Sequence, residues 1–134
     1  MKGKDPKDCC FCKELANNDP SIYFQDTYFF AKWDPAPKRL GHTLIIPKMH
    51  IGSILWLTPQ IEQLLPLFRQ QVLHIIEHNY LPDAYIIGSN NGEAAGQSLF
   101  HAHEHIIPQY NDDPAPRGGL RNFDSVYVPP VVPD

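Results

Sequence analysis

Three histidines alternate with other residues late in the chain, at His101, His103 and His105. In an extended segment, side chains two residues apart point to the same side, so the three imidazoles are predicted to lie in one row. Charged imidazoles packed together repel one another, so folding favours neutral rings unless an anion binds there. Neutral rings serve as nucleophiles, ligands or hydrogen-bond relays. The row therefore indicates a site, and the alternative is three solvated histidines on an edge strand.

Two further segments carry groups that suit an anion. His42 opens a predicted strand directly after Gly41, where a ligand or neighbouring backbone can approach closely. Residues 90–98 are small or carry amides, and they can present backbone N–H groups and a hydroxyl to anionic oxygens. Alone, each feature also fits a hydrogen-bonded strand end or an ordinary glycine-rich connection. Beside the histidine row, both favour a binding site.

All three cysteines lie together, at Cys9, Cys10 and Cys12. They cannot form a disulfide framework, and in a reducing compartment such a cluster is typical of metal-binding or redox-active sites. Cys9 and Cys12 form a C-x-x-C pair, and two more ligands would complete a tetrahedral zinc site. The alternative is a free cysteine cluster, and Cys10 is spare in either case.

A separate histidine pair matches a zinc-peptidase arrangement, H-x-x-E-H, at His74, Glu77 and His78. Both histidines lie opposite the apolar stripe of a predicted helix, where they face water. The sequence therefore favours a solvated helix face over a metal site.

Composition limits the class of protein. The 134 residues are enough for one domain with its own core, and 43% hydrophobic and 19% charged residues are typical of globular proteins. A net charge of -4 argues against nucleic-acid binding through a basic surface. The chain has no apolar run long enough to cross a membrane and no signal-peptide pattern at its start, so we expect no membrane association and a cytoplasmic location.

The periodicity predicts an antiparallel α+β domain. Strands are expected over residues 22–25, 27–32, 42–46 and 85–88 and over the histidine segment. One main helix is expected from Thr58, as N-cap, to Asn79, with a kink or short break at Pro66. Its apolar stripe consists of Ile61, Leu64, Leu65, Phe68, Val72, Ile75 and Ile76.

The segment from Gly96 to Pro108 reads Gly-Gln-Ser, two further residues, the three alternating histidines and an apolar pair. This order resembles the histidine triad (HIT) superfamily of nucleotide hydrolases and transferases, and the resemblance extends through residues 41–48, residues 90–93 and Asp34. It implies a HIT-like fold over residues 1–110, with a five-stranded antiparallel sheet, one main helix and a short N-terminal helix. The Pro/Gly-rich tail, residues 111–134, is then expected to pack on the domain or on a dimer partner.

The resemblance implies a role for each site residue. His103 would attack the α-phosphorus of a nucleotide, and His105, His42 and His101 would stabilise charge or orient the phosphate. Ser98, Gln97 and Asn90 would bond the phosphate or leaving group, and Asp34 would accept from the ribose hydroxyls. The candidates for the base pocket are Ile22, Phe24, Phe30 and Trp33, with Phe24 favoured as core.

The resemblance also implies a structural zinc ion held by Cys9, Cys12, His50 and His101, with no cofactor for catalysis. One position departs from the family pattern, because Glu104 occupies an apolar slot. A buried carboxylate needs a partner, so we expect Glu104 to be hydrogen-bonded or near an edge.

Three functions follow as expectations. The first is hydrolysis of a nucleoside phosphoramidate or adenylylated substrate through a nucleotidyl-histidine intermediate, with a purine nucleotide as substrate and a homodimer as the assembly. The second is cleavage of dinucleoside polyphosphates, for which the tail segment Arg117–Arg121 supplies basic contacts. The third is a zinc-bearing nucleotide-binding module with little turnover.

Overall fold

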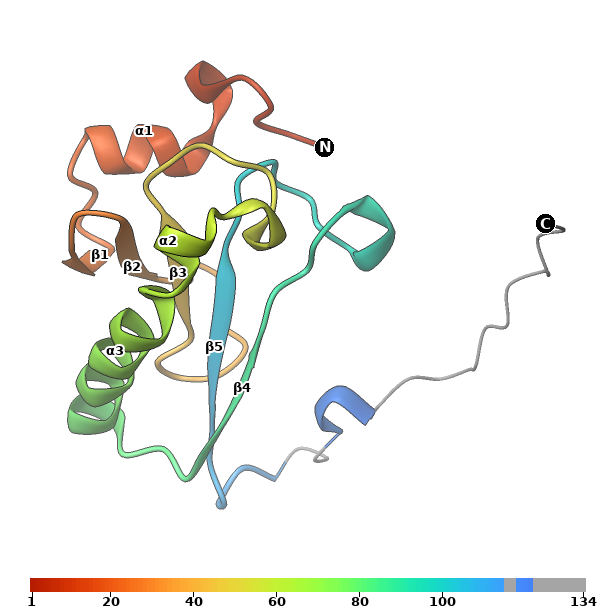
Figure 1. The fold of residues 1–134 in the computed structure, drawn as a ribbon. Helices are drawn as coiled ribbons and strands as arrows, with labels where there is room; N and C mark the ends of the chain where they lie inside the picture. Colours follow the sequence, from red (N-terminus) through yellow and green to blue (C-terminus); the bar gives the residue numbers. More distant parts are fainter. Residues whose placement is uncertain (115–117, 122–134) are drawn as a thin grey trace, which may run out of the picture.

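The computed structural model describes residues 1–114 and 118–121, which fold around one five-stranded antiparallel sheet (Figure 1). Its strands, in the sheet order β1-β2-β3-β5-β4, are β1 (Ile22–Gln25), β2 (Phe29–Trp33), β3 (Thr43–Pro47), β5 (Glu104–Gln109) and β4 (Ala84–Gly88). The helices are α1 (Cys10–Ala16), α2 (Pro59–Glu62) and α3 (Leu65–Tyr80), and the 3-10 turns are η1 (Pro6–Asp8), η2 (Ile54–Trp56), η3 (Glu93–Ala95) and η4 (Gly119–Arg121). This architecture confirms the predicted α+β class, with one long helix and a short N-terminal helix.

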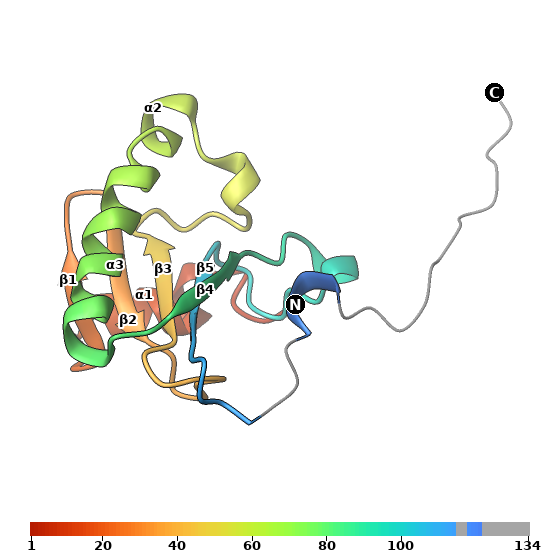
Figure 2. The same ribbon diagram turned by 90° about the horizontal axis from the view of Figure 1, so that it is seen from below.

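The two faces of the sheet carry different helices, as Figure 2 shows with α3 on one side and α1 on the other. The larger core cluster, on the α3 face, consists of Phe29, Ala31, Ile45, Leu57, Leu65, Phe68, Val72, Ile76 and Ile106. The smaller cluster, on the α1 face, consists of Cys9, Phe11, Phe30, Leu44 and Ile46. Alternate residues of β2 thus pack on opposite helices, as the period of a strand requires.

The expected break in the main helix is confirmed. α2 ends at Glu62 and α3 begins at Leu65, with Pro66 in its first turn, where a missing N–H does no harm. Leu64 was predicted to be part of the apolar stripe, but it caps α3 at this break and is 37% exposed. The helix ends at Tyr80, one residue beyond the prediction, and Leu81 follows with a left-handed φ of 51°.

The histidine strand begins later than the alternation predicts. β5 starts at Glu104, so His105 lies in the strand while His101 and His103 precede it. In the preceding segment the His101 N–H donates to the Leu99 carbonyl at 2.9 Å, a local bond within a bend rather than a rung of the sheet. The ladder with β3 therefore holds only the last histidine.

The tail is described only in part. Arg117 lies outside the described residues, and so does the side chain of Arg121, whose backbone ends η4. The division at residue 110 and the packing of the tail therefore stay predictions. Among the described helices, none is both long and apolar enough to cross a membrane.

Glu104 has the partner that its burial requires. The residue is 6% exposed on the α3 face of the sheet, and Arg69 of α3 contacts both its carboxylate oxygens. The guanidinium nitrogens lie 2.9 to 3.3 Å from these oxygens. The expectation of a hydrogen-bonded Glu104 is thus confirmed, and the carboxylate is held by a charge-assisted, forked contact.

Removing the arginine alone should destabilise the fold. Arg69→Met leaves a buried carboxylate without its cation, and because Arg69 is partly exposed we expect a loss of about 2–3 kcal/mol in the free energy of unfolding. Urea denaturation at pH 7 measures this loss. The double variant Arg69→Met/Glu104→Leu should regain most of it, and equal losses in both variants would contradict the argument.

Candidate active site and metal-ligand cluster

A cavity of about 260 Å³ opens on the α1 face of the sheet. Its lining residues are Cys10, Phe11, Glu14, Lys32, Asp34, Pro35, Leu44, Asn90, Gly96, Gln97, Ser98, Leu99, His103 and His105. The cavity thus combines two of the three alternating histidines with most of the polar residues predicted for the site. Its wall is made by α1, by β2 and β3, and by the loop that leads into β5.

The three histidines stay neighbours although only the last is in the strand. The rings of His103 and His105 lie 5.2 Å apart, and Phe11 of α1 packs edge-on against both His101 and His103. Nδ1 of His103 lies 2.8 Å from the His101 carbonyl oxygen, which can only accept. The proton of a neutral His103 is therefore on Nδ1, which leaves the Nε2 lone pair free to act as a nucleophile.

His42 lies behind His105 and does not line the cavity. Its Nδ1 accepts from the Lys38 N–H at 3.0 Å, so the proton of the neutral ring is on Nε2. That N–H faces Nδ1 of His105 at 2.9 Å and Oδ2 of Asp34 at 3.4 Å. As acceptor at Nδ1, His105 then carries its own proton on Nε2. The pair forms a relay that keeps a donor on His105.

Burial keeps these rings neutral. Desolvation, followed by the neighbouring His103 and His42, lowers the pKa of His105 to about 4, against the raising effect of Asp34. Desolvation also lowers the pKa of His42, against the raising effect of Asp34. Near pH 7 both imidazoles are therefore uncharged hydrogen-bonding groups rather than fixed cations.

The loop before β5 is held by the side chain of Gln97, which is buried. Its Oε1 accepts from the Gly92 N–H at 2.8 Å, and its Nε2 donates to the carbonyls of Gly52 and Leu99 at 2.6 and 2.8 Å. These bonds occupy the amide of Gln97, so its role here is to shape the loop. The exposed Ser98 also lines the cavity and is the hydroxyl that a ligand can meet.

The structure does not bring every predicted site residue to the cavity. Trp33 packs on the α3 face, where it stacks on Tyr23 at 3.8 Å and meets the edge of Tyr80. Ile22 packs beside the smaller core cluster, which also contains the fully buried Phe30. None of the three lines the cavity, so a base would meet other residues.

The sequence analysis assigned several lining residues of the cavity to no site, among them Phe11, Glu14 and Lys32. Lys32 is only 3% exposed and pairs with Glu14. The sequence did indicate the orientation of Lys32. Its neighbours in β2, Ala31 and Trp33, pack on the α3 face, so the alternation of a strand places Lys32 on the α1 face. The partner on α1 could not be foreseen, since the docking of that helix is a tertiary contact.

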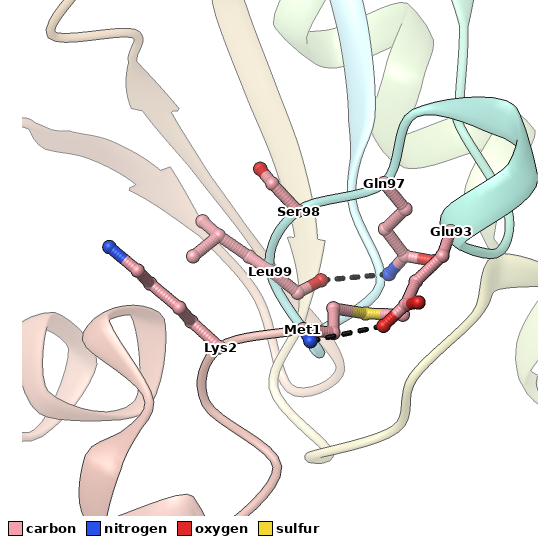
Figure 3. Close-up of a pocket in the computed structure, with 6 residues that line it drawn as sticks. All are labelled: Met1, Lys2, Glu93, Gln97, Ser98 and Leu99. Carbon is pink, nitrogen blue, oxygen red and sulfur yellow. Dashed lines mark hydrogen bonds and ion pairs between the residues drawn. The ribbon is translucent and has the colours of Figure 1, made fainter.

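A second, more open hollow of about 550 Å³ adjoins the cavity (Figure 3). It is lined by Met1, Lys2, Glu93, Gln97, Ser98 and Leu99, of which the last three also line the cavity. The Met1 ammonium lies 3.0 Å from a Glu93 oxygen, and the Ser98 side chain points away from this ion pair. The loop around Ser98 therefore separates two adjoining spaces.

The structure also gathers Cys9, Cys12, His50 and His101, whose ligand atoms all lie within 4.8 Å of one another. The two Nδ1 atoms are 3.2 Å apart, and the recorded sulfur–nitrogen distances are 3.3, 3.3 and 3.6 Å. Ligands on a tetrahedral zinc ion would be separated by about 3.3 Å for two nitrogens and about 3.6 Å for nitrogen and sulfur. The four donors therefore have the spacing of a tetrahedral metal site.

Hydrogen bonds at the outer ring nitrogens support the same conclusion. Nε2 of His101 lies 2.8 Å from the Pro47 carbonyl oxygen, and Nε2 of His50 lies 3.0 Å from the Lys4 carbonyl oxygen. Each Nε2 must donate, so both Nδ1 atoms present lone pairs to the cluster. Two lone pairs facing each other beside two thiols are the donor set of a cation.

The other histidine pair of the sequence analysis lies elsewhere, since His74 and His78 of α3 are exposed, as predicted.

The sequence matches the family model described as HIT domain over residues 16–112. It is 36% identical over 105 residues to the protein hit of Bacillus subtilis, covering 78% of this chain and 72% of that protein. The chain belongs to the HIT domain family. It is also 34% identical over 107 residues to adenosine 5'-monophosphoramidase hnt1 of Schizosaccharomyces pombe, covering 78% of this chain and 77% of that protein. Adenylylsulfatase HINT3 of Arabidopsis thaliana is 33% identical over 79% of this chain and 54% of its own length.

Solved structures agree with this membership in the HIT domain family. A protein from Streptococcus mutans superposes with a TM-score of 0.74 and 32% identity, covering 98% of this chain and 79% of that one. A zinc-bound histidine triad family protein from Mycobacterium smegmatis gives a TM-score of 0.72 with 29% identity, covering 82% and 81%. The HIT-like fold expected from the motif is thus confirmed.

The low pKa of His105 predicts how the stability of this HIT domain changes with pH. The unfolded chain takes up a proton near the ordinary value of 6.5, whereas folded His105 does so only near 4. The free energy of unfolding should therefore fall as the pH is lowered from 6.5 to 4. Urea denaturation across this range should show a shallower fall for His105→Gln than for the parent. His74→Gln, at an exposed site, is the control, and identical profiles for all three proteins would contradict the assignment.

Proposed function

We propose that this protein is a nucleotidyl hydrolase or transferase that cleaves the α-phosphate bond of a nucleoside phosphoramidate or a related adenylylated substrate. The observation that carries the proposal is the contact between His103 Nδ1 and the His101 carbonyl oxygen at 2.8 Å. In the neutral ring this contact places the proton on Nδ1, so Nε2 carries the lone pair, and the ring lines the cavity. A neutral imidazole held in this tautomer is an activated nucleophile for phosphorus.

The reaction takes two steps with His103 as the group that carries the nucleotide. First, Nε2 forms a bond to the α-phosphorus while the bond to the leaving amine breaks, and the amine takes up a proton. Water then attacks the phosphorus, the bond to Nε2 breaks, and the nucleoside monophosphate leaves with His103 restored. If an alcohol or amine takes the place of water, the same intermediate gives transfer.

The neighbouring groups suit the charge that develops in this reaction. His105 would donate from Nε2 to a phosphate oxygen, because its Nδ1 faces His42. Asp34 lines the cavity beside this relay and would accept from the ribose hydroxyls. Ser98 and Asn90 line the same space, and Ser98 also borders the second hollow, where the leaving group would lie.

The relatives support the substrate class. Two of them are named adenosine 5'-monophosphoramidase and adenylylsulfatase, at 34% and 33% identity. Both names specify an adenosine or adenylyl group joined to a different leaving group. A purine nucleotide with a variable leaving group is therefore the proposed substrate of this chain, and the homodimer implied by the resemblance stays a prediction.

Substitution of the nucleophile tests the proposal. His103→Ala should lower the rate of adenosine 5'-phosphoramidate hydrolysis by at least about 10³-fold, because it removes the ring that forms the nitrogen–phosphorus bond in the proposed mechanism. Steady-state release of adenosine monophosphate measures this loss, with His74→Ala as the matched control. Rapid mixing and quenching should also trap an acid-labile nucleotidyl-protein in the parent. Full activity of His103→Ala would refute the mechanism.

The same assay separates the alternatives. A diadenosine polyphosphate cleaved faster than the phosphoramidate would favour the second expected function, whose proposed contacts at Arg117 and Arg121 lie outside the described side chains. A parent protein that binds adenosine monophosphate but cleaves neither substrate would favour the binding module. His103, His105 and Ser98 are the residue types expected for catalysis, and all three line the cavity, which favours an enzyme over a binding module.

We further propose that Cys9, Cys12, His50 and His101 hold a structural zinc ion. Their spacing and the inward lone pairs support this assignment, as does a zinc-bound relative. When bound, zinc would tie α1 to the segment that carries His101 and would supply folding free energy rather than a catalytic step.

Loss of one ligand should remove the metal and weaken the fold. Cys12→Ser should lower the zinc content from about one ion per chain to a small fraction of that value. The unfolding temperature should fall with it, because metal binding contributes to folding. Elemental analysis and thermal denaturation check both effects, and Cys10→Ser, outside the cluster, is the control. Retention of zinc by Cys12→Ser together with an unchanged unfolding temperature would refute the site.

A further inference from the structure

An ion pair formed by a buried lysine and a partly buried glutamate lines the active-site cavity away from the histidines. Lys32 of β2 is 3% exposed, and its ammonium bonds to Glu14 of α1, whose side chain is 25% exposed. Both residues line the same cavity as His103 and His105. Lysine is almost never this deeply buried without a partner, so the pair is a deliberate feature of this cavity rather than a chance surface contact.

The register of the sheet shows where the pair lies relative to the nucleophile. Lys32 is opposite Leu44, and Leu44 is opposite His105, so all three lie on one face. Two strand spacings separate Lys32 from His105, or about 10 Å. Phe11 fills the space between, with its ring centroid 5.7 Å from the Lys32 ammonium and 5.3 Å from the His103 ring.

The burial of this ion pair is weak evidence that it serves stability. A buried pair loses so much hydration that well-packed apolar residues in its place are often as stable or more stable. The adjoining wall is apolar, since Phe11, Leu44 and Leu99 also line the cavity. A few polar groups in an otherwise apolar wall are the usual means by which a site orients its ligand.

We propose that Lys32 and Glu14 determine base specificity by reading the polar edge of a purine, an inference that rests on the proposed function. With the phosphate at His103, a nucleotide would extend its base across Phe11 and Leu44 toward this pair. The ammonium would donate to a ring nitrogen or carbonyl oxygen of the base, and the carboxylate would accept from an amino group. Adenine presents such a combination at N7 and its N6 amino group.

A site that hydrogen-bonds its ligand discriminates between similar ligands more strongly than an apolar site does. An analogue that lacks the polar group leaves the protein group that bonded it without a partner. The probes are therefore adenosine and guanosine 5'-monophosphates, which carry exocyclic amino groups, and purine riboside 5'-monophosphate, which carries none. Calorimetric titration of the full chain should show the better of the first two binding at least about tenfold more tightly than the third.

The test variant replaces both charges. In Lys32→Met/Glu14→Met, whose apolar side chains keep the volume, the preference should fall below about threefold, with the affinity for purine riboside monophosphate nearly unchanged. Lys13→Met, an exposed lysine on α1, is the matched control and should keep the parent's preference. Thermal denaturation checks that each variant is folded, and Glu14→Gln gives a second measurement in which Lys32 is kept.

The outcomes distinguish this inference from the proposed function. If the double variant and Glu14→Gln keep the parent's preference, the pair does not read the base and the inference is wrong, while the chemistry at His103 stands. If the parent itself shows no preference, the inference is also wrong. If the parent binds none of the three monophosphates, the proposed function fails with it.

Discussion

The hydrogen bond from His103 to the His101 carbonyl is the contact on which the rest of the site depends. It selects the tautomer of the proposed nucleophile, and it works only while that carbonyl is held still. The ring of His101 does this, because one nitrogen meets the Pro47 carbonyl and the other faces the cysteine–histidine cluster. His101 therefore connects the proposed metal site, through its side chain, with the proposed nucleophile His103, through its backbone carbonyl.

Burial supplies the second condition for this chemistry. The rings of His42 and His105 have lowered pKa values because water is excluded around them, and their mutual contact gives each proton a defined place. Neutral imidazoles in fixed tautomers can donate toward a developing charge through the one N–H that each ring carries. Asp34 lies beside both rings without reversing the shift, so neither histidine forms a permanently charged ion pair with it.

The short helix α1 brings three functions together. Cys9 caps this helix and Cys12 lies in its first turn, and both belong to the proposed metal-ligand cluster. Phe11 of α1 packs against two of the three alternating histidines, and Glu14 pairs with Lys32 at the cavity wall. The opposite face of the sheet is occupied by α3 and carries the larger core. Stability is thus concentrated on one face, and the other can expose polar groups to a ligand.

Local pattern was sufficient for much of this protein. Some features depend only on neighbours in the chain: the strand and helix periods, Pro66, and the spacing of the histidines and cysteines. These features predicted the strands of the sheet, the broken helix and the types of donor side chain. Contacts between distant segments decided the rest. Strand register and helix docking decide which side of the sheet Trp33 faces and that His42 lies behind His105. They also decide that Lys32 pairs with Glu14. Those arise only when the whole core packs, because no short segment contains the energy that selects them.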